Sequence, residues 1–478
     1  MLKYFKKMAS AARVAISSST ATAAAASYLS FRSLTFLGTS SGTPTTSRNV
    51  SSYALTLSDG AVWLFDAGEG TQHQLLKCQN VSRGSIDKIF VTHLHGDHSF
   101  GLPGLMCSTS LTWTPPTSAA AAAAAASDND EDEDDVDGGP RAFYPPFSKR
   151  SQYLELIGPV GLAAYLRSAL ISSESRFPFQ YRVTELIPPI SEARRAAVRG
   201  VLFPSKPNTM LSNLLEAMRH PDEAEPLIIT PNNGVEGDDT FPYLHYNITF
   251  PNTPQLTVQA AALNHRTFCV GYAITEQDAP GTLLMEKVTA LGVPKGPLLS
   301  QLKSGAPVTF NTINAEDGTV ASVTVAPDQV VGPSAPGRRV VLLGDTCDSP
   351  HMASLLQSAS HSPTPASLIS SSPRGVDWVV HESTFNMDKQ DLAIPRGHST
   401  TRMAGAFAAQ IHAKNLILTH FSARYPSSEK DPEAMESLRA EAQAAAGSAT
   451  LVHVADDFKV FDLERKKVAV GAPPTKKK

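Results

Sequence analysis

The chain has 478 residues, 42% of them hydrophobic, which is enough for one large core or two smaller ones. No window offers the roughly 18 to 20 consecutive apolar residues of a membrane span. The four cysteines are scattered without a C-x-x-C pair, which argues against a disulfide framework or a cysteine–zinc site and favours a reducing compartment. The net charge of −4 depends on eight acidic residues at positions 128–137; without them basic residues are in excess, which permits a nucleic-acid partner.

The N-terminus is basic and rich in Ser and Ala, and the first acidic residue is Asp59. This composition is typical of an organellar transit peptide. We therefore expect residues 1–30 to be a disordered leader that directs the chain to a mitochondrion or plastid. The alternative is a plain disordered tail on a protein of the nucleus or cytoplasm.

Short apolar stretches and one helical pattern lead to a loop of unusual composition. A helix is predicted at Gly70–Gln79, and strands are predicted at Leu34–Gly38, Tyr53–Leu57, Ala61–Asp66 and Asp87–Thr92. The last strand ends in VTHLHGDHSF (residues 91–100), which places three histidines and one aspartate within six residues.

Three segments interrupt the pattern. Residues 115–142 combine an alanine run with the acidic block, so we expect a disordered insertion. Residues 191–240 are poorly patterned and are interpreted as a second insertion. Residues 276–337 are rich in Gly, Pro and Lys and contain one short helical pattern. With a flexible basic tail at 466–478, the folded domain is expected to span 31–465.

The second half repeats the pairing of a strand with an ionisable residue. We predict strands at Tyr153–Gly158 and Leu256–Leu263, a helix opening at Pro159, and strands within RRVVLLGD, VDWVVHE and KNLILTH. The last three stretches end in Asp345, in His381 and Glu382, and in His420. Apolar strands that alternate with helices indicate a layered α/β fold, and such folds place chemistry along one edge of the sheet.

The histidine loop is a candidate site for two metal ions. His93 and His95 are two residues apart, so their imidazoles can converge on one cation. Asp97 and His98 point elsewhere and can bind a second cation. Imidazole suits zinc, and carboxylate is a compatible ligand. Two adjacent cations would lower the pKa of a water molecule towards about 7 and supply a nucleophile at neutral pH.

Two complete metal shells need more donors than this loop offers. The strand ends provide His265, Asp345 and His420 as candidates. An aspartate between two cations is the natural bridge, so we assign that place to Asp345. Position alone would make each of the three an ordinary polar group at a strand end.

The stretch THLHGDHSFGLPGL (92–105) resembles the metallo-β-lactamase superfamily and, within it, the tRNase Z (ribonuclease Z) family of tRNA 3′-processing endonucleases. Further stretches match the family in order: LTFLGTSSGTPTTSRN, LFDAGEGTQHQLL, ELIGPVGLAAYL, GVPKGPLLSQLKSG, GDTCDS, VVHESTF, GHSTTRMAGAFA and LILTHFSARY. Cys347 stands where the family often has arginine. One set of motifs resembles the family's short form, enlarged by insertions.

The resemblance implies a four-layer αββα metallo-β-lactamase sandwich with a protruding arm (276–337) and low-complexity insertions. It also implies two zinc ions (Zn2+) between the sheets. By motif position, one zinc is held by His93, His95 and His265, the other by Asp97, His98 and His420, and Asp345 bridges them. Manganese (Mn2+) is a second metal that these donors accept.

The reaction implied is cleavage of precursor tRNA near the discriminator nucleotide, which leaves a 3′-hydroxyl. Asp97 can also act as general base beside the attacking water. His398 in GHST is the predicted general acid, and Glu382 can orient it and raise its pKa. The alternative for His398 is an ordinary place at a helix N-terminus, where Ser399 and Thr400 are good caps.

Other residues are assigned supporting roles. Asp66 is expected to anchor the histidine loop from behind the ligands, and His381 to be structural. Arg48, with the hydroxyls of its loop, can contact a phosphate, although turn chemistry explains the same residues. Phosphate contacts to the tRNA elbow are expected from three lysines of the arm, Lys287, Lys295 and Lys303. The family's short forms are homodimers in which one subunit's arm serves the other's site, so a homodimer is expected.

Three other functions fit part of the pattern. A phosphodiesterase of the same fold acting on a small or cyclic nucleotide would share the metal site, but would not need a 60-residue arm. A glutathione thioester hydrolase would share the metal loop but not the GHST and THFSARY stretches. An inactive RNA-binding scaffold would not need to keep all seven ligand candidates.

Overall fold

The computed structural model describes residues 28–110, 153–188, 219–231, 245–279, 281–313, 320–358 and 375–465. The chain divides into two compact units. Of the described residues, the arm unit contains 277–279, 281–313 and 320–337 together with Tyr28 and Leu29, and the larger unit contains the rest. The predicted leader up to residue 27, the insertion at 115–142 and the tail at 466–478 lie outside the described residues.

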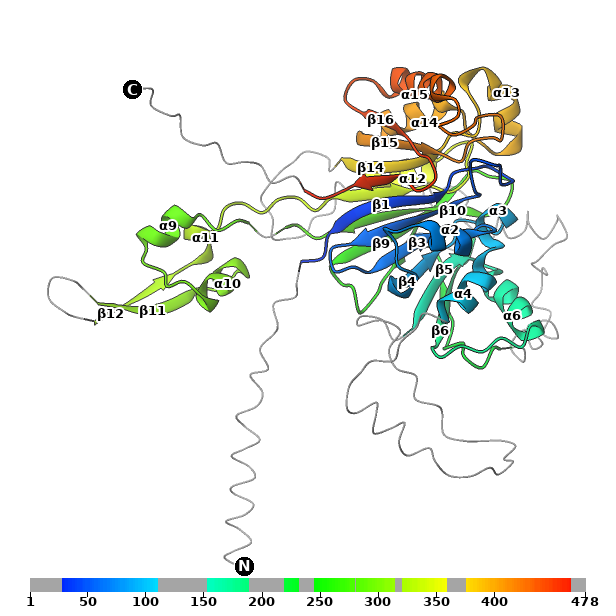
Figure 1. Cartoon of the computed structure of the whole chain (residues 1–478). Helices are drawn as coiled ribbons and strands as arrows, with labels where there is room; N and C mark the ends of the chain where they lie inside the picture. Colours follow the sequence, from blue (N-terminus) through cyan, green and yellow to red (C-terminus); the bar gives the residue numbers. More distant parts are fainter. Residues whose placement is uncertain are drawn as a thin grey trace, which may run out of the picture. The chain divides into compact units, whose positions relative to one another are not determined.

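The first sheet of the larger unit has eight strands (Figure 1). Their order is β17 (Val460–Asp462), β1 (Phe31–Gly38), β2 (Ser52–Leu57), β3 (Val62–Phe65), β4 (Ile86–Phe90), β5 (Leu154–Pro159), β6 (Tyr181–Leu186) and β7 (Leu227–Ile229). Strands β17 to β3 pair antiparallel, and β3 to β7 run parallel. Every residue of β3 and β5 is buried, as expected for strands covered on both faces.

The second sheet has seven strands. Their order is β16 (Leu451–Val454), β15 (Ala413–Thr419), β14 (Val376–Glu382), β13 (Arg339–Leu342), β10 (Cys269–Glu276), β9 (Leu256–Leu263) and β8 (His245–Ile248). Strands β13 to β16 are parallel. The carboxyl ends of the three strands predicted from RRVVLLGD, VDWVVHE and KNLILTH therefore lie at one edge of the sheet.

Aromatic side chains fill the space between the two sheets. Tyr53 stacks on Phe65 with ring centroids 5.6 Å apart, and Phe65 stacks on Phe90 at 4.8 Å. Phe90 in turn meets Tyr272 of β10 edge-on at 5.1 Å. Because Phe90 and Tyr272 belong to different sheets, these rings show that the sheets pack face to face.

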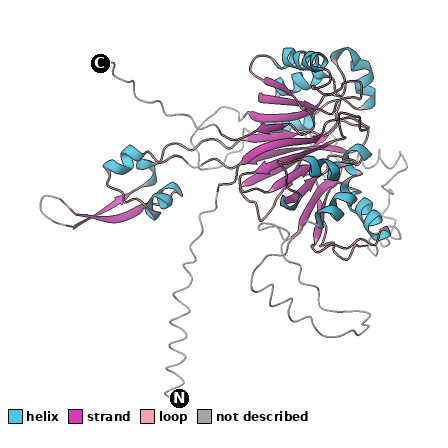
Figure 2. Cartoon of the chain, viewed as in Figure 1, coloured by secondary structure: helices cyan, strands magenta, loops and turns pink. Residues whose placement is uncertain are grey.

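Helices cover the outer faces of the sandwich (Figure 2). The first sheet shares a core with α2 (Thr71–Lys77), α4 (Leu102–Ser110) and α6 (Leu162–Ser172). The second sheet shares a core with α12 (Pro350–Ser358), α14 (Thr401–Gln410) and α15 (Pro432–Ala446). Shorter helical elements are α3 (Gly96–Ser99), α13 (Gln390–Ala393) and the 3₁₀ turns Arg83–Ser85, Met387–Lys389 and Ile394–Arg396. The predicted αββα sandwich is confirmed.

In the larger unit, six of the described strands were missing from the sequence-based prediction: β6, β7, β8, β10, β16 and β17. Four of them, β7, β8, β16 and β17, have only three or four residues, too few to show a period. The prediction of a second insertion at 191–240 is wrong in part. Residues 219–231 lie within that range and contain β7, which pairs with β6. The helix expected at Pro159 begins at Leu162, after Gly161 with a φ of 101°.

The arm unit has more structure than its sequence suggested. It contains α9 (Met285–Ala290), α10 (Pro297–Lys303), α11 (Pro327–Val330) and a hairpin of β11 (Val308–Ile313) and β12 (Val320–Val325). A small core of its own includes Val288, Leu302, Val308 and Phe310. The sequence analysis predicted only one helical pattern in this segment, whereas the structure has α9, α10 and α11. No helix in the part of the chain that the structure describes has the length and apolarity to cross a membrane.

Candidate metal centre

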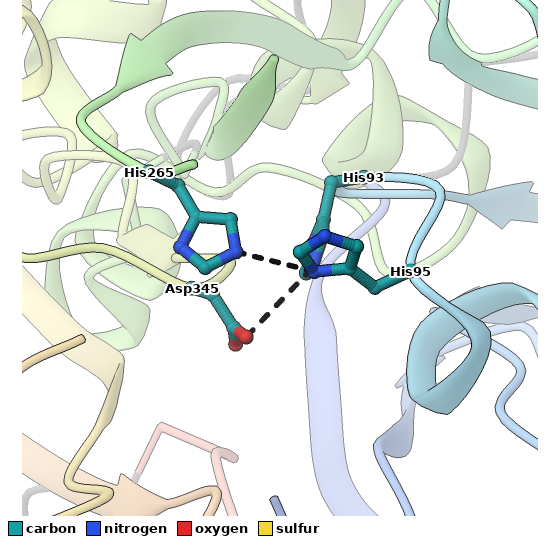
Figure 3. A group of neighbouring side chains, drawn as sticks. All are labelled: His93, His95, His265 and Asp345. Atoms are coloured by element: carbon teal, nitrogen blue, oxygen red, sulfur yellow. Dashed lines mark hydrogen bonds and ion pairs between the residues drawn. The ribbon is translucent and has the colours of Figure 1, made fainter. Parts of the chain in front are cut away.

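The first group of donors gathers where β4 and β9 end. His93 and His95 follow β4, His265 follows β9, and Asp345 follows β13. Figure 3 shows the three imidazoles and the carboxylate turned towards one another. His95 Nδ1 lies 3.0 Å from His93 Nε2 and 3.2 Å from His265 Nε2, and all four ligand atoms lie within 4.8 Å of one another.

A second group shares Asp345 with the first. It contains Asp97 and His98 of α3 and His420, which follows β15. The Nε2 atoms of His98 and His420 are 3.2 Å apart, and each lies 3.3 Å from Asp345 Oδ1. His420 Nε2 also lies 3.4 Å from Asp97 Oδ2. The structure thus brings all seven predicted ligands together and puts Asp345 in the shared position.

Four of the five imidazoles are held at Nδ1, which leaves Nε2 for the cluster. The Nδ1 partners are Thr92 Oγ1 for His93 (3.1 Å), Asp66 for His98 (2.7 Å), the Gly397 carbonyl for His265 (2.6 Å) and Thr384 Oγ1 for His420 (3.0 Å). Such partners fix the orientation of metal-binding histidines. His95 is the exception, since its Nδ1 faces His93 and His265.

Asp66 lies where the sequence placed it, behind the histidine loop. It is buried and accepts hydrogen bonds from Thr92 N (2.7 Å) and Thr92 Oγ1 (2.8 Å) as well as from His98. Its backbone φ is 55°, and that of His420 is 59°. Non-glycine residues rarely adopt this left-handed conformation, and at functional sites the surrounding structure enforces it.

The protonation states of the first group suit a metal ion. Burial lowers the pKa of His93 and His265 and lowers that of His95 to about 4, so these imidazoles are neutral. Burial acts to raise the pKa of Asp97 and Asp345, but the nearby histidines outweigh it and lower both. Neutral imidazole and ionised carboxylate are the forms that bind zinc, so the first group fits a zinc ion. In the second group burial acts to lower the pKa of His98, but the nearby carboxylates, Asp345 first, outweigh it and raise the pKa, so His98 would release a proton on binding a metal.

A pocket of about 430 Å³ opens onto this cluster. Its lining includes His95, Asp97, Asp345 and His398. The loop between β1 and β2 (residues 39–51, the N-terminal loop) also contributes to the pocket. In this loop Gly42, with a φ of 74°, donates its backbone N–H to Asp97 Oδ2 at 2.7 Å. The site is therefore open to a substrate on the side where the two groups of donors meet.

Sequence relatives identify the family. Ribonuclease BN of Cronobacter sakazakii is 32% identical over 429 residues, which span 89% of this chain and 98% of that protein. Ribonuclease Z of Pediococcus pentosaceus is 32% identical over 82% of this chain and 89% of its own length. The chain belongs to the ribonuclease Z family.

Other relatives of this ribonuclease Z family member extend the comparison. Zinc phosphodiesterase ELAC protein 1 of Mus musculus is 32% identical over 91% of this chain and 99% of its own length. The family description "Anti-Pycsar protein Apyc1" matches residues 32–119. The crystal structure of human tRNase Z, short form (ELAC1), has a TM-score of 0.49 and 24% identity, and covers 91% of this chain and all of that one.

The predicted proton donor lies next to the second group of donors. His398 Nδ1 is 3.0 Å from Glu382 Oε1 and 3.7 Å from Asp345 Oδ2. Burial acts to lower the pKa of His398, but the Glu382 carboxylate outweighs it and raises the pKa to about 9. His398 follows the turn at Gly397, while Thr400 caps α14 through its side chain. The capping role considered for this segment therefore belongs to Thr400.

Thr384 is a site residue that the sequence analysis missed. Its hydroxyl donates to Glu382 Oε2 at 2.5 Å and contacts His420 Nδ1 at 3.0 Å. Thr384 thus links the carboxylate beside His398 to a metal-ligand candidate. The signal was present, because Thr384 lies two residues after Glu382 in the matched VVHESTF stretch. His381 is buried beside Phe407, and its Nδ1 bonds the Glu382 carbonyl, which fits the structural role predicted for it.

The structure does not support phosphate binding by Arg48. Its guanidinium is buried, lies 2.8 Å from Asp456, and donates to Thr39 Oγ1 and the Ala455 carbonyl. Buried charges of this kind are held by their partners and are not offered to a ligand. The predicted phosphate-binding lysines are exposed in the arm unit: Lys287, Lys295 and Lys303.

Proposed function

We propose that this chain is a zinc-dependent endoribonuclease that removes the 3′ trailer from precursor tRNA and leaves a 3′-hydroxyl for CCA addition. The observation that supports it best is the pair of donor groups sharing Asp345. The second support is a set of relatives named ribonuclease Z that match most of the chain. Hydrolysis of a phosphodiester requires an activated water, relief of charge on the phosphate and a proton for the leaving oxygen.

The donor groups would hold the two metals. One zinc would bind His93, His95 and His265, the other would bind Asp97, His98 and His420, and Asp345 would contribute to both. Bound zinc would supply a lowered pKa for a water molecule and positive charge beside the phosphate. Asp97 has a further role through the N-terminal loop, because its carboxylate accepts the Gly42 N–H and so fixes one wall of the pocket. We infer that the same carboxylate also accepts a proton from the attacking water, the general-base role expected from the sequence.

His398 provides the proton, and Glu382 orients it. As the water oxygen bonds to phosphorus, the bond from phosphorus to the 3′-oxygen breaks and that oxygen takes up a proton. Glu382 occupies Nδ1 of His398, so Nε2 is the ring nitrogen left to donate. A pKa of about 9 keeps the imidazole protonated at neutral pH, and His398 lines the pocket.

Cleavage of a defined precursor tests the function. We expect zinc-loaded protein to cut a precursor tRNA once, after the discriminator nucleotide, and to leave a 3′-hydroxyl. Asp345→Asn should lose the activity, and Asp59→Asn, a change outside the site, should keep it. A ladder of products from the wild type would contradict the proposal. Cleavage of methyl p-nitrophenyl phosphate but of no tRNA would point to a small-molecule phosphodiesterase.

Three finer properties complete the proposal. The seven donors support two zinc ions per chain, which metal analysis can count, and manganese is a second metal that they accept. The match to a short-form motif set supports a homodimer, which mass measurement in solution can test. The basic, acid-poor residues 1–30 support import into a mitochondrion or plastid, which a fluorescent fusion with and without these residues can test.

A further inference from the structure

One large apolar side chain is exposed at the edge of the metal pocket. Phe100 directly follows α3, which contains Asp97 and His98. Its exposed fraction is 63%, whereas Leu102, at the start of the next helix, is fully buried. Phe100 lines the same pocket as His398 and the ligand candidates.

The ring of Phe100 has a defined place. A Cβ added to Gly96 would lie 2.4 Å from the ring carbon Cε2 of Phe100. The ring therefore lies over the backbone of Gly96, in space that the side chain of any other residue would fill. The backbone N–H of Phe100 donates to the Gly96 carbonyl at 3.0 Å. Tyr165 lies beside the ring, with centroids 6.5 Å apart, and its hydroxyl donates to the Ser99 carbonyl. One side of the ring is thus supported by the protein while much of its surface stays exposed.

A single exposed apolar residue is common on protein surfaces and needs no ligand. The surroundings of Phe100 indicate which kind of ligand would contact it. Much of the pocket lining is polar, with hydroxyls, charged groups and metal donors, including Thr43, Glu69 and Arg266. A wholly apolar ligand would not match that lining. A nucleotide matches it, because its phosphate is polar and its base has a flat face that stacks on an aromatic ring.

We propose that Phe100 is the stacking platform for the base of one of the two nucleotides that flank the cleaved phosphodiester. This inference rests on the proposed function, since it assumes an RNA substrate at the metal pocket. Stacking on an aromatic ring accepts every base. Phe100 therefore positions the RNA at the metal centre without selecting the RNA sequence.

Substitutions at Phe100 measure the contribution of the ring. Phe100→Ala is expected to lower kcat/KM for a precursor tRNA by roughly 10-fold to 100-fold, the size of an aromatic–base contact. Phe100→Leu should lose nearly as much, because it keeps apolar bulk without a π face, and Phe100→Trp should restore activity. Leu76→Ala is the matched control: Leu76 in α2 is also 63% exposed but does not line the pocket, so no change is expected. Zinc content and melting temperature identify variants that fail to fold.

Abasic substrates decide which base stacks. Two precursors are made, one without the discriminator base and one without the first trailer base. On the precursor that lacks the stacked base, the kcat/KM of the wild type should fall to that of Phe100→Ala. On the other abasic precursor, the wild type should remain more active than Phe100→Ala.

Three results would overturn the stacking role. They are full activity of Phe100→Ala on the intact precursor, a leucine variant as active as the tryptophan variant, and an undiminished difference on both abasic precursors. A change of oligomeric state in place of the loss of activity would instead assign Phe100 to a subunit contact. A wild type that cuts no precursor would refute the proposed function itself, so the two failures can be told apart.

Discussion

Replacing Asp66 by alanine is expected to weaken the metal centre, although Asp66 belongs to neither donor group. The carboxylate accepts two hydrogen bonds from Thr92 and one from His98, all between 2.7 and 2.8 Å, and it is buried. At about 1.5 kcal/mol for each of the three bonds to the charged carboxylate, their loss lowers the free energy of unfolding by about 4 to 5 kcal/mol. Zinc affinity should fall by roughly 10-fold to 100-fold, the usual effect of removing a residue that orients a ligand.

Asp66→Asn separates the two effects. Asparagine tolerates the left-handed backbone and keeps one oxygen to accept from Thr92. Its amide nitrogen is a donor and cannot accept the Nδ1–H of His98. The asparagine variant should therefore keep much of the stability and still lose zinc affinity.

Asp457→Ala is the control for general destabilisation. Asp457 also accepts three hydrogen bonds, from Thr39 Oγ1 and Asn49 N at 2.7 Å and from Gln74 Nε2 at 2.9 Å. Among the described residues, none of these donors hydrogen-bonds a ligand candidate. Calorimetry of the metal-free proteins and competition with a zinc chelator give the stability and the affinity. If Asp66→Ala binds zinc as tightly as Asp457→Ala does, the role of Asp66 in orienting His98 is wrong.

Two more changes test the proton donor and the arm. An acid with a pKa of about 9 is about 90% protonated at pH 8, and one at the ordinary 6.5 is about 3% protonated. Glu382→Gln should therefore reduce cleavage about 30-fold at pH 8 but much less at pH 6. In this variant the pKa of His398 is lower, so His398 loses its proton at a lower pH than in the wild type. An unchanged alkaline limb of the pH–rate profile would contradict this role of Glu382. Replacing the three arm lysines by alanine should reduce the slope of log affinity for precursor tRNA against log salt by about one per lysine, and an unchanged slope would remove them from the RNA contact.

The ends of the central strands could be predicted because burial marks them in the sequence. Strands β13, β14 and β15 are short apolar runs, and each is followed or ended by an ionisable residue, which stands out against its neighbours. Parallel strands in one sheet bring such residues to a common edge. His265 was harder to place, because β9 is antiparallel to β10 and the sequence shows no pairing partner. Its assignment came from the family resemblance, and the structure places it beside His95.

Arg48 shows where local sequence is insufficient. An arginine in a loop of hydroxyls and turn residues looks available to a phosphate. Its actual partner, Asp456, is about 400 positions away in the sequence, so nothing near Arg48 shows that it is buried. The hairpin of the arm unit was missed for another reason: β11 and β12 are six residues each and lie among Gly and Pro residues that indicate loops.

The backbone strain at the metal centre has no sequence signal at all. Asp66 and His420 follow ordinary strands, and only the structure shows that both have a left-handed φ. Such a conformation costs roughly 1 to 2 kcal/mol for a residue with a Cβ, so the sandwich and the hydrogen bonds of the two side chains must hold it. Asp66 supports His98, and His420 lies 3.2 Å from His98 across the second donor group. Since the fold enforces these two positions, the second donor group is set by the packing of the sheets, and the precision of the site depends on the stability of the whole sandwich.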